Sequence, residues 1–151
     1  MTALGLPNVR RAEAKVRRRV DRLVELLAIG DIRDRFVREL STGSRRIVDL
    51  ACCMAAEPRI LLLDEPSSGI AQKESEELGP LLQRIKFETG CTLMLIEHDM
   101  PLIMSVSDEL IALELGAVVT RGAPLDVVEH PQVVASYLGT SDEVIRRSGS
   151  V

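Results

Sequence analysis

Two adjacent carboxylates, Asp64 and Glu65, follow directly on four large apolar residues, Ile60 to Leu63. An unbroken apolar run of this kind predicts a strand buried on both faces, as in a parallel sheet that is covered by helices. Ligands of such sheets bind beyond the carboxyl ends of the strands. Two carboxylates buried together are costly unless a cation, a proton or a positive partner offsets their charge, so the pair indicates metal binding and acid–base chemistry. The alternative is a strand that simply ends in solvated acids.

A second apolar run, Thr92 to Ile96, also ends in polar residues, namely Glu97, His98 and Asp99. If the two runs are neighbouring parallel strands, their carboxyl ends lie at the same edge of the sheet, and the His98 imidazole reaches the same crevice as the two acids. A lone histidine is more often an ordinary satisfied polar residue. The position of this one, at the end of an apolar strand, favours a functional role.

A third candidate site is the small-residue turn Ser41-Thr42-Gly43-Ser44, which precedes an expected helix over residues 46–56. A helix N-terminus presents unpaired N–H groups and a partial positive charge. Ser41 adds a hydroxyl, and Gly43 allows a phosphate to approach the backbone closely. The turn therefore suits anion binding, and the alternative is an ordinary serine-capped helix.

In chain order, the turn, the strand that ends in acids and the strand that ends in histidine resemble the signature turn, the Walker B strand and the switch histidine of the ATPase subunits of ABC transporters. The segment from Gly116 to Gly139 looks like the end of the branched-chain amino-acid import branch of that family. The resemblance covers nearly the whole chain. It implies a partial α/β P-loop NTPase fold, in which parallel strands are flanked by helices, with part of the α-helical subdomain before them and a β-hairpin plus helices after them.

The resemblance also implies roles for the strand-end residues. Asp64 would hold Mg²⁺ through coordinated water, and Glu65 would polarise the attacking water as a general base. His98 would contact the γ-phosphate of ATP and the same water. These three residues would therefore carry the hydrolytic chemistry of phosphoryl transfer.

The turn and the loop after the acids would act across a subunit boundary. Residues 41–44, that is Ser41, Thr42, Gly43 and Ser44, would meet the nucleotide held by the opposite ATPase subunit, and Ser68 and Gly69 would belong to the D-loop. The sequence departs from the family's Leu-Ser-Gly-Gly-Gln at Thr42 and Ser44, and Ala71 stands where most relatives carry an aspartate. These differences predict altered contacts to the nucleotide and between the two sites.

A phosphate-binding Gly-x-x-x-x-Gly-Lys-Ser/Thr motif does not occur in the sequence. We therefore expect the C-terminal part of an ABC ATPase, either a separately expressed piece or a shortened reading frame. Residues 1–40 would be part of the α-helical subdomain, 41–140 the C-terminal part of the catalytic core, and 141–151 a polar tail. The isolated chain is expected to be inactive as an ATP hydrolase until a phosphate-binding portion completes it.

The functional hypothesis that follows is coupling of ATP and Mg²⁺ to import of amino acids or similar small solutes. Its partners would be membrane permease subunits and a second ATPase subunit, at the cytoplasmic face of the cell membrane. The alternative is a non-hydrolytic truncated subunit that docks on a permease or on a full-length ATPase. Nucleic acid is not expected as a partner, because the basic segment around Arg17 to Arg22 fits the polar side of a helix and has no aromatic residues nearby for base stacking.

Apolar periodicity and turn residues predict the remaining elements. Cys52, Cys53 and Cys91 are odd in number and lack metal-ligand spacing, so they are expected to be reduced thiols of the core. Gly30 is expected to end the first helix, and Gly79-Pro80 to kink the helix around them. The expected helices cover residues 11–28, 31–39, 46–56, 72–88 and 100–107, and the expected hairpin strands 110–113 and 118–121 flank Gly116.

Overall fold

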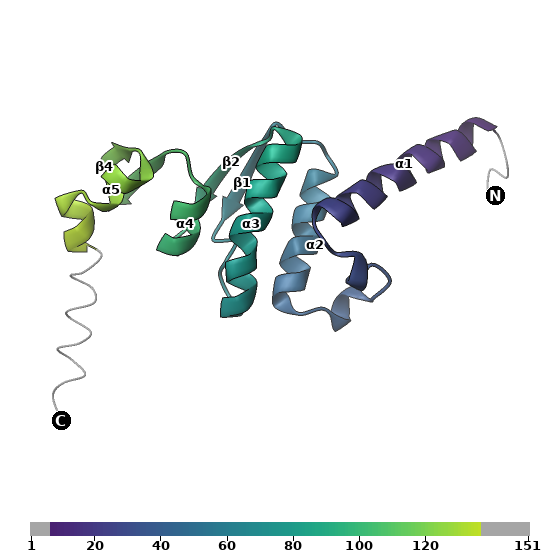
Figure 1. Ribbon diagram of the computed structural model, residues 1–151, viewed down its shortest axis with the longest axis horizontal. Coiled ribbons are helices and arrows are strands. Elements are labelled where there is room, and N and C mark those ends of the chain that lie inside the picture. Colours follow the sequence, from purple (N-terminus) through teal and green to yellow (C-terminus); the bar gives the residue numbers. More distant parts are fainter. Residues whose placement is uncertain (1–6, 137–151) are drawn as a thin grey trace, which may run out of the picture. The chain divides into compact units, whose positions relative to one another are not determined.

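The computed structural model describes residues 7–136 (Figure 1). The chain divides into two compact units, Met1–Ile103 and Met104–Val151. The predicted polar tail from residue 141 lies outside the described residues. Over residues 7–136, no helix combines the length and the apolar character that crossing a bilayer requires.

A β–α–β unit lies at the centre of the first unit. Strand β1 (Ile60–Asp64) pairs in parallel with β2 (Thr92–Ile96), and helix α3 (Gln72–Thr89) connects them. The register joins Ile60 to Thr92 at one end and Asp64 to Ile96 at the other. The buried residues of α3 recur at helical spacing and include Leu78, Leu81, Leu82 and Ile85.

Gly90 ends α3 as expected. Its φ of 67° is left-handed, which glycine adopts without steric cost, and its N–H donates to Lys86 O at 3.0 Å. The helix continues through Gly79 and Pro80 as one element. Predicted and observed bounds of α3 and β2 agree to within one residue, because both have a clear apolar pattern and a glycine between them.

Only one face of the strand pair is buried. Leu61 is 6% exposed, whereas its neighbours Ile60 and Leu62 are 61% and 69% exposed. Met94 and Ile96 of β2 belong to the same uncovered face. The prediction that the first strand is buried on both faces is therefore wrong for the described residues. The four exposed side chains form what we call the open face of the sheet.

Helix α2 (Thr42–Met54) begins four residues earlier than expected. Ser41 is its N-cap and accepts a hydrogen bond from the Ser44 N–H at 3.0 Å, so residues 42–44 form the first helical turn rather than a loop before it. Leu50 and Met54 are buried as their spacing predicts.

The cysteines divide between the core and the surface. Cys91 is buried, but Cys52 and Cys53 are exposed on α2, so the expectation that all three are core thiols is wrong for these two. Cys52 and Cys53 follow the buried Leu50 by two and by three residues, respectively. Cys52 therefore lies on the side of the helix opposite Leu50, and Cys53 lies at the exposed edge of the face that Leu50 and Met54 bury.

Helix α1 (Pro7–Leu26) ends in a Schellman motif. Ala28 has a left-handed φ of 54°, its N–H donates to Glu25 O at 3.1 Å, and the Ile29 N–H donates to Val24 O at 3.0 Å. Ala28, and not the predicted Gly30, is therefore the left-handed residue that ends α1. The expected helix over 31–39 is also wrong, because two short 3₁₀ helices, η1 (Gly30–Ile32) and η2 (Val37–Glu39), occupy this segment.

The second unit contains the expected hairpin. Strands β3 (Leu110–Glu114) and β4 (Ala117–Gly122) are antiparallel, and Leu115 and Gly116, both with positive φ, form the two-residue turn. Helix α5 (Pro124–Val128) contacts both strands, and residues 131–136 are helical. Glu114 joins this last helix to the hairpin, since one oxygen accepts from Gln132 at 2.9 Å and the other from Ser136 at 2.8 Å.

The strain at Ala28 can be tested by substitution. Ala28→Gly should stabilise the chain by about 0.5–1 kcal/mol, because glycine removes the left-handed penalty and loses only part of that gain to backbone entropy. The matched control is Ala55→Gly, at an exposed residue that ends α2 with an ordinary φ of −62°. It should destabilise by a similar amount. Urea unfolding midpoints measure both, and an Ala28→Gly midpoint below wild type would contradict the assignment.

The Glu114 contacts predict a pH dependence. Hydrogen bonds from Gln132 and Ser136 lower the pKa of Glu114 below its ordinary value of 4.5. Because the pKa of Glu114 is lower in the folded chain, its ionised carboxylate stabilises the fold at pH values above 4.5. This contribution to stability is lost as the pH falls through the lowered pKa. Carboxyl NMR titration should show Glu114 below 4.5 in wild type and closer to 4.5 in Gln132→Ala. Equal values in the two proteins would exclude the contact.

Candidate functional site

The carboxyl ends of β1 and β2 bring two of the predicted residues together. Asp64 pairs with Ile96, and the ladder continues one residue further because the Glu65 N–H donates to Ile96 O at 2.8 Å. The chain then leaves both strands at the same edge. His98 Nδ1 lies 3.7 Å from Glu65 Oε1, so the imidazole and the carboxylate face one another.

Glu65 has a strained backbone. Its φ is 44°, a left-handed value that is uncommon for a residue with a side chain, and it precedes Pro66. Such a conformation costs about 1–3 kcal/mol and persists only where surrounding contacts enforce it. Here the Glu65 N–H is bound by Ile96 O, and the Glu65 carbonyl accepts from the Ser68 N–H at 3.0 Å.

Glu97 fixes the same turn from the second strand. Its Oε1 accepts from the Ser67 N–H at 2.8 Å, and its Oε2 lies 3.2 Å from the His98 N–H. One carboxylate therefore connects the backbone after Glu65 with the backbone of His98. The sequence pattern did not indicate a role for Glu97, and only its place beside the strand-end histidine could have suggested one.

The acids are open to solvent in the described chain. Asp64 is exposed, and the side chains of Glu65 and His98 are 52% and 74% exposed. The argument from two buried carboxylates is therefore wrong as stated, because their burial would need further atoms over this edge. What the geometry supports is a carboxylate that can take a proton from water beside an imidazole that can donate a hydrogen bond.

Magnesium fits the donor chemistry but is not enclosed. Carboxylate oxygens suit Mg²⁺, which commonly keeps several waters and binds through one or two carboxylates together with substrate phosphates. Among the described residues, no group of three or more His, Cys, Asp and Glu side chains is placed to hold a metal ion. Asp64 could therefore contribute to a Mg²⁺ site whose other ligands are water and a nucleotide.

The turn over residues 41–44 is occupied by a contact within the chain. Ser41 Oγ donates to Glu74 Oε1 at 2.7 Å, and the second oxygen of Glu74 accepts from the Ala71 N–H at 3.3 Å. A Cβ on Gly43 would collide with the Glu74 carboxylate, which shows how closely that group covers the glycine backbone. Glu74 was not predicted, although an acid three residues after a helix start is a recognised capping signal.

The loop between the acids and α3 carries Ser68 and Gly69. Both are exposed, and Gly69 has a φ of 73°. The Ile70 N–H reaches Ser67 O at 3.5 Å, so the loop folds back on itself directly after the turn at Glu65. In the described part of the chain, the Ser68 side chain makes no hydrogen bond.

Comparison with known proteins finds similarity to ABC transporter proteins. The family model described as ABC transporter matches residues 4–68. The chain is 35% identical over 133 residues to the high-affinity branched-chain amino acid transport ATP-binding protein BraF of Pseudomonas aeruginosa, covering 88% of this chain and 52% of the relative. The chain is homologous to ABC transporter ATP-binding proteins.

Other relatives widen the range of transported solutes. The chain is 34% identical to LivG of Escherichia coli K12, a branched-chain amino acid transport ATP-binding protein, over 90% of this chain and 53% of the relative. It is also 35% identical to the sulfate/thiosulfate import ATP-binding protein CysA of Acinetobacter baylyi, over 89% of this chain and 39% of the relative. The chain thus spans about half or less of the curated relatives' length.

Solved structures show the same fold. cbiO1 of Clostridium perfringens, part of the ABC transporter complex cbiONQ, matches with a TM-score of 0.73 and 27% identity over 91% of this chain and 53% of that one. The ADP conformation of MJ1267, an ATP-binding cassette of an ABC transporter, matches with a TM-score of 0.72 and 25% identity over 81% of this chain and 49% of that one. The predicted α/β ABC ATPase fold is therefore confirmed.

Asp99 is a further residue whose role the sequence pattern did not reveal. Its Oδ1 accepts from the Leu102 N–H at 3.0 Å, so it caps helix α4 (Met100–Val106), and its Oδ2 accepts from Ser75 Oγ at 3.3 Å. An aspartate directly before a helix is a capping signal that could have identified it. Together, Glu97 and Asp99 fix the backbone on both sides of His98.

The role of Glu97 can be measured by hydrogen exchange. Glu97→Ala removes the acceptor of the Ser67 N–H and should speed exchange of that amide about tenfold or more, because a hydrogen bond to a charged group contributes roughly 1.5–3 kcal/mol. Glu97→Gln keeps an oxygen acceptor and should have a smaller effect. Glu77→Ala, at an exposed acid of α3, serves as the control. Unchanged Ser67 exchange in Glu97→Ala would contradict the contact.

Proposed function

We propose that the chain supplies the C-terminal, hydrolytic part of an ABC transporter ATPase that couples ATP binding and hydrolysis to import of amino acids or similar small solutes. The observation that carries the proposal is the approach of His98 Nδ1 to Glu65 Oε1, at 3.7 Å, where two paired strands end. Homology to BraF and LivG supports it.

In the proposed reaction, Glu65 polarises the water that attacks the γ-phosphate, and His98 contacts that phosphate and orients the water. Asp64 lies one residue earlier, in β1, and would hold Mg²⁺ through coordinated water. The metal would supply neutralisation of the charge on the phosphates. The strained turn at Glu65 and the hydrogen bonds that Glu97 accepts from the Ser67 and His98 N–H groups would hold the backbone of Glu65 and His98 in place during the reaction.

A phosphate-binding portion would complete the site and cover the open face of the sheet. Parallel sheets occur almost only with both faces covered, and Ile60, Leu62, Met94 and Ile96 leave one face to solvent. This exposed apolar surface supports the expectation of further atoms over β1 and β2. The same atoms would exclude water from Glu65 and His98 and strengthen the electrostatics of the site.

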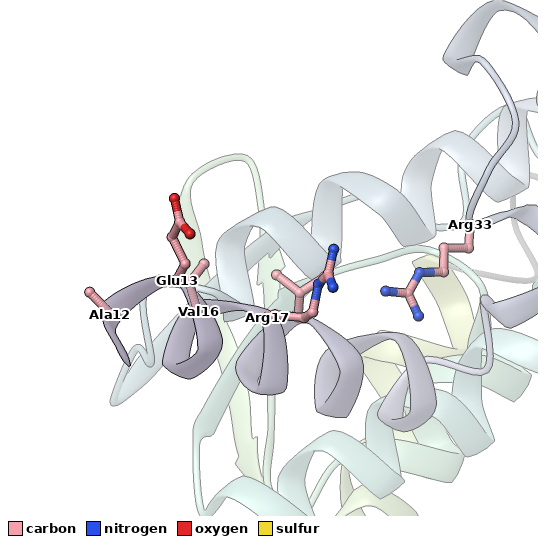
Figure 2. A pocket seen from close by; sticks show the side chains of 6 residues that line it. Ala12, Glu13, Val16, Arg17 and Arg33 are labelled. Atoms are coloured by element: carbon pink, nitrogen blue, oxygen red, sulfur yellow. The ribbon is translucent and has the colours of Figure 1, made fainter. Parts of the chain in front are cut away.

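The proposed protein partners are a second ATPase subunit and membrane permease subunits, at the cytoplasmic face of the membrane. The second subunit would bring its nucleotide to residues 41–44. A hollow of about 440 Å³ on α1 is a candidate for permease contact. Figure 2 shows Glu13, Val16 and Arg17 on α1 and Arg33 reaching in from the segment after η1, so both apolar and charged side chains line the hollow.

Amino acids are the proposed solutes because BraF and LivG are named for branched-chain amino acid transport. The sulfate and thiosulfate relative CysA shows that similar ATPases serve other solutes. Solute choice would lie in the permease and in any binding protein, so this chain would contribute energy coupling rather than selectivity.

A second candidate function is docking without hydrolysis, on a permease or on a full-length ATPase. The solvent exposure of Asp64, Glu65 and His98 favours it, because these groups lack an enclosed pocket within the described residues. Under this hypothesis, changes at Asp64 and Glu65 have no consequence, whereas changes at Ser41 still matter.

Substitution of Glu65 separates the two functions. The chain is joined behind the N-terminal half of the P. aeruginosa relative, which restores a full-length subunit, and steady-state ATP hydrolysis and nucleotide binding are measured. Glu65→Gln should lower kcat by about 10²-fold or more, the contribution of a positioned general base, while the Kd for MgATP stays within about threefold.

Glu77→Gln, an isosteric change at an exposed acid of α3, is the control and should hydrolyse ATP as the unsubstituted chimera does. Retained turnover in Glu65→Gln would overturn the hydrolytic assignment. Loss of function in Ser41→Ala combined with normal function in Glu65→Gln would favour the docking function.

A further inference from the structure

One carboxylate joins the N-termini of two helices that the sequence separates widely. Glu74 lies in the first turn of α3, where it accepts from the Ala71 N–H at 3.3 Å. The same carboxylate accepts from Ser41 Oγ, the N-cap of α2, at 2.7 Å. These residues are 33 positions apart, so the contact is tertiary and not a local cap.

The contact between Ser41 and Glu74 uses the Ser41 hydroxyl, which a bound phosphate would need as a hydrogen-bond donor. A serine hydroxyl has a single proton to donate. The short distance from Ser41 Oγ to the Glu74 carboxylate indicates that this proton is used in a strong hydrogen bond to Glu74. Ser41 Oγ also lies 3.0 Å from the Ser44 hydroxyl and accepts from the Ser44 N–H, so its acceptor capacity serves α2 itself. A phosphate at Ser41 therefore has to replace Glu74 as the partner of that proton.

The carboxylate also covers the glycine of the turn. A side-chain carbon placed on Gly43 would collide with the Glu74 carboxyl carbon and both oxygens, and Gly43 is buried although Thr42 before it is exposed. A phosphate approaching the Gly43 backbone would meet this negative group first. Charge repulsion and steric exclusion by Glu74 therefore both oppose phosphate binding at this turn.

We infer that Glu74 is an internal competitor of the nucleotide phosphate at residues 41–44, and that the phosphate must displace it to bind. This inference deepens the proposed function, on which it rests for the role of the turn. Displacement has a second consequence, because Glu74 also holds the Ala71 N–H at the end of the loop that carries Ser68 and Gly69. Arrival of a phosphate at α2 thereby loosens the start of α3.

The first turn of α3 extends this link to the strand-end site. Ser75, the next residue, donates to Asp99 Oδ2 at 3.3 Å, and Asp99 follows His98 directly. Adjacent residues of α3 thus contact the turn at Ser41 and the segment that carries His98. Glu74 is therefore a positioning residue that couples the two sites, and it takes no part in the chemical step.

A titration with inorganic phosphate tests the competition on the full chain. Amide NMR signals of residues 41–44 report binding. Glu74→Gln keeps the shape and an oxygen acceptor for the Ala71 N–H but removes the charge, so phosphate should bind at these signals about fivefold or more tighter than in wild type, the factor expected for like charges roughly 4 Å apart in water. Glu77→Gln, one turn further along α3, should bind as wild type does.

The tighter phosphate binding of Glu74→Gln should require the Ser41 hydroxyl. The double variant with Ser41→Ala and Glu74→Gln should therefore bind phosphate no more tightly than wild type. A Glu74→Gln affinity equal to that of Glu77→Gln, a gain that survives Ser41→Ala, or shifts confined to other residues would each overturn the inference. In the full-length chimera, Glu74→Gln should lower the KM for MgATP. Loss of hydrolysis in Glu65→Gln together with an unchanged phosphate affinity in Glu74→Gln would leave the proposed function standing and remove only the competition.

Discussion

The parallel register of β1 and β2 determines where every group of the strand-end site lies. Asp64 pairs with Ile96, so the residues that follow each strand leave the sheet at one edge. A slip of one residue would move one strand end by roughly 3.3 Å and turn its side chains to the other face. Glu65 and His98 would then no longer meet. The apolar pattern of the strands specifies this register, and α3, which ends at the left-handed Gly90, returns the chain to the start of β2.

Geometry and environment are separate requirements for this site. The turn at Glu65 is held by backbone bonds to Ile96 and Ser68 and by the Glu97 carboxylate, so the positions are already defined. The electrostatic interactions remain weak, because an exposed pair such as Glu65 and His98 contributes at most about 1 kcal/mol. Covering the open face would change the dielectric around a site whose geometry is complete. Under the proposed function, a portion that binds the phosphates and covers this face would activate the site without rearranging it.

The sequence predicted those features that depend on local patterns. Apolar runs identified β1 and β2, and Gly90 marked the end of α3. Residues that act through tertiary contacts were missed, because a glutamate such as Glu74 or Glu97 looks like any surface acid until the fold brings a distant N–H or hydroxyl to it. The burial of β1 was misjudged for the same reason. An apolar pattern shows which faces of a strand are suited to burial, but not whether other parts of the protein lie over those faces. Ala28 shows a further limit, because a Schellman motif with alanine at the left-handed position has no distinctive residue.

Helix α3 has the properties that coupling between two sites requires. It is a single 18-residue helix whose interior side chains, among them Leu82 and Ile85, are fully buried, so its body is firmly anchored. Its first turn is held mainly by polar contacts, from Glu74 to Ser41 and from Ser75 to Asp99. A change at either contact therefore acts first on this turn and on the loop of Ser68 and Gly69 that precedes it. Phosphate binding at residues 41–44, as proposed, would reach the residues beside His98 through the first turn of α3, without any displacement of the core.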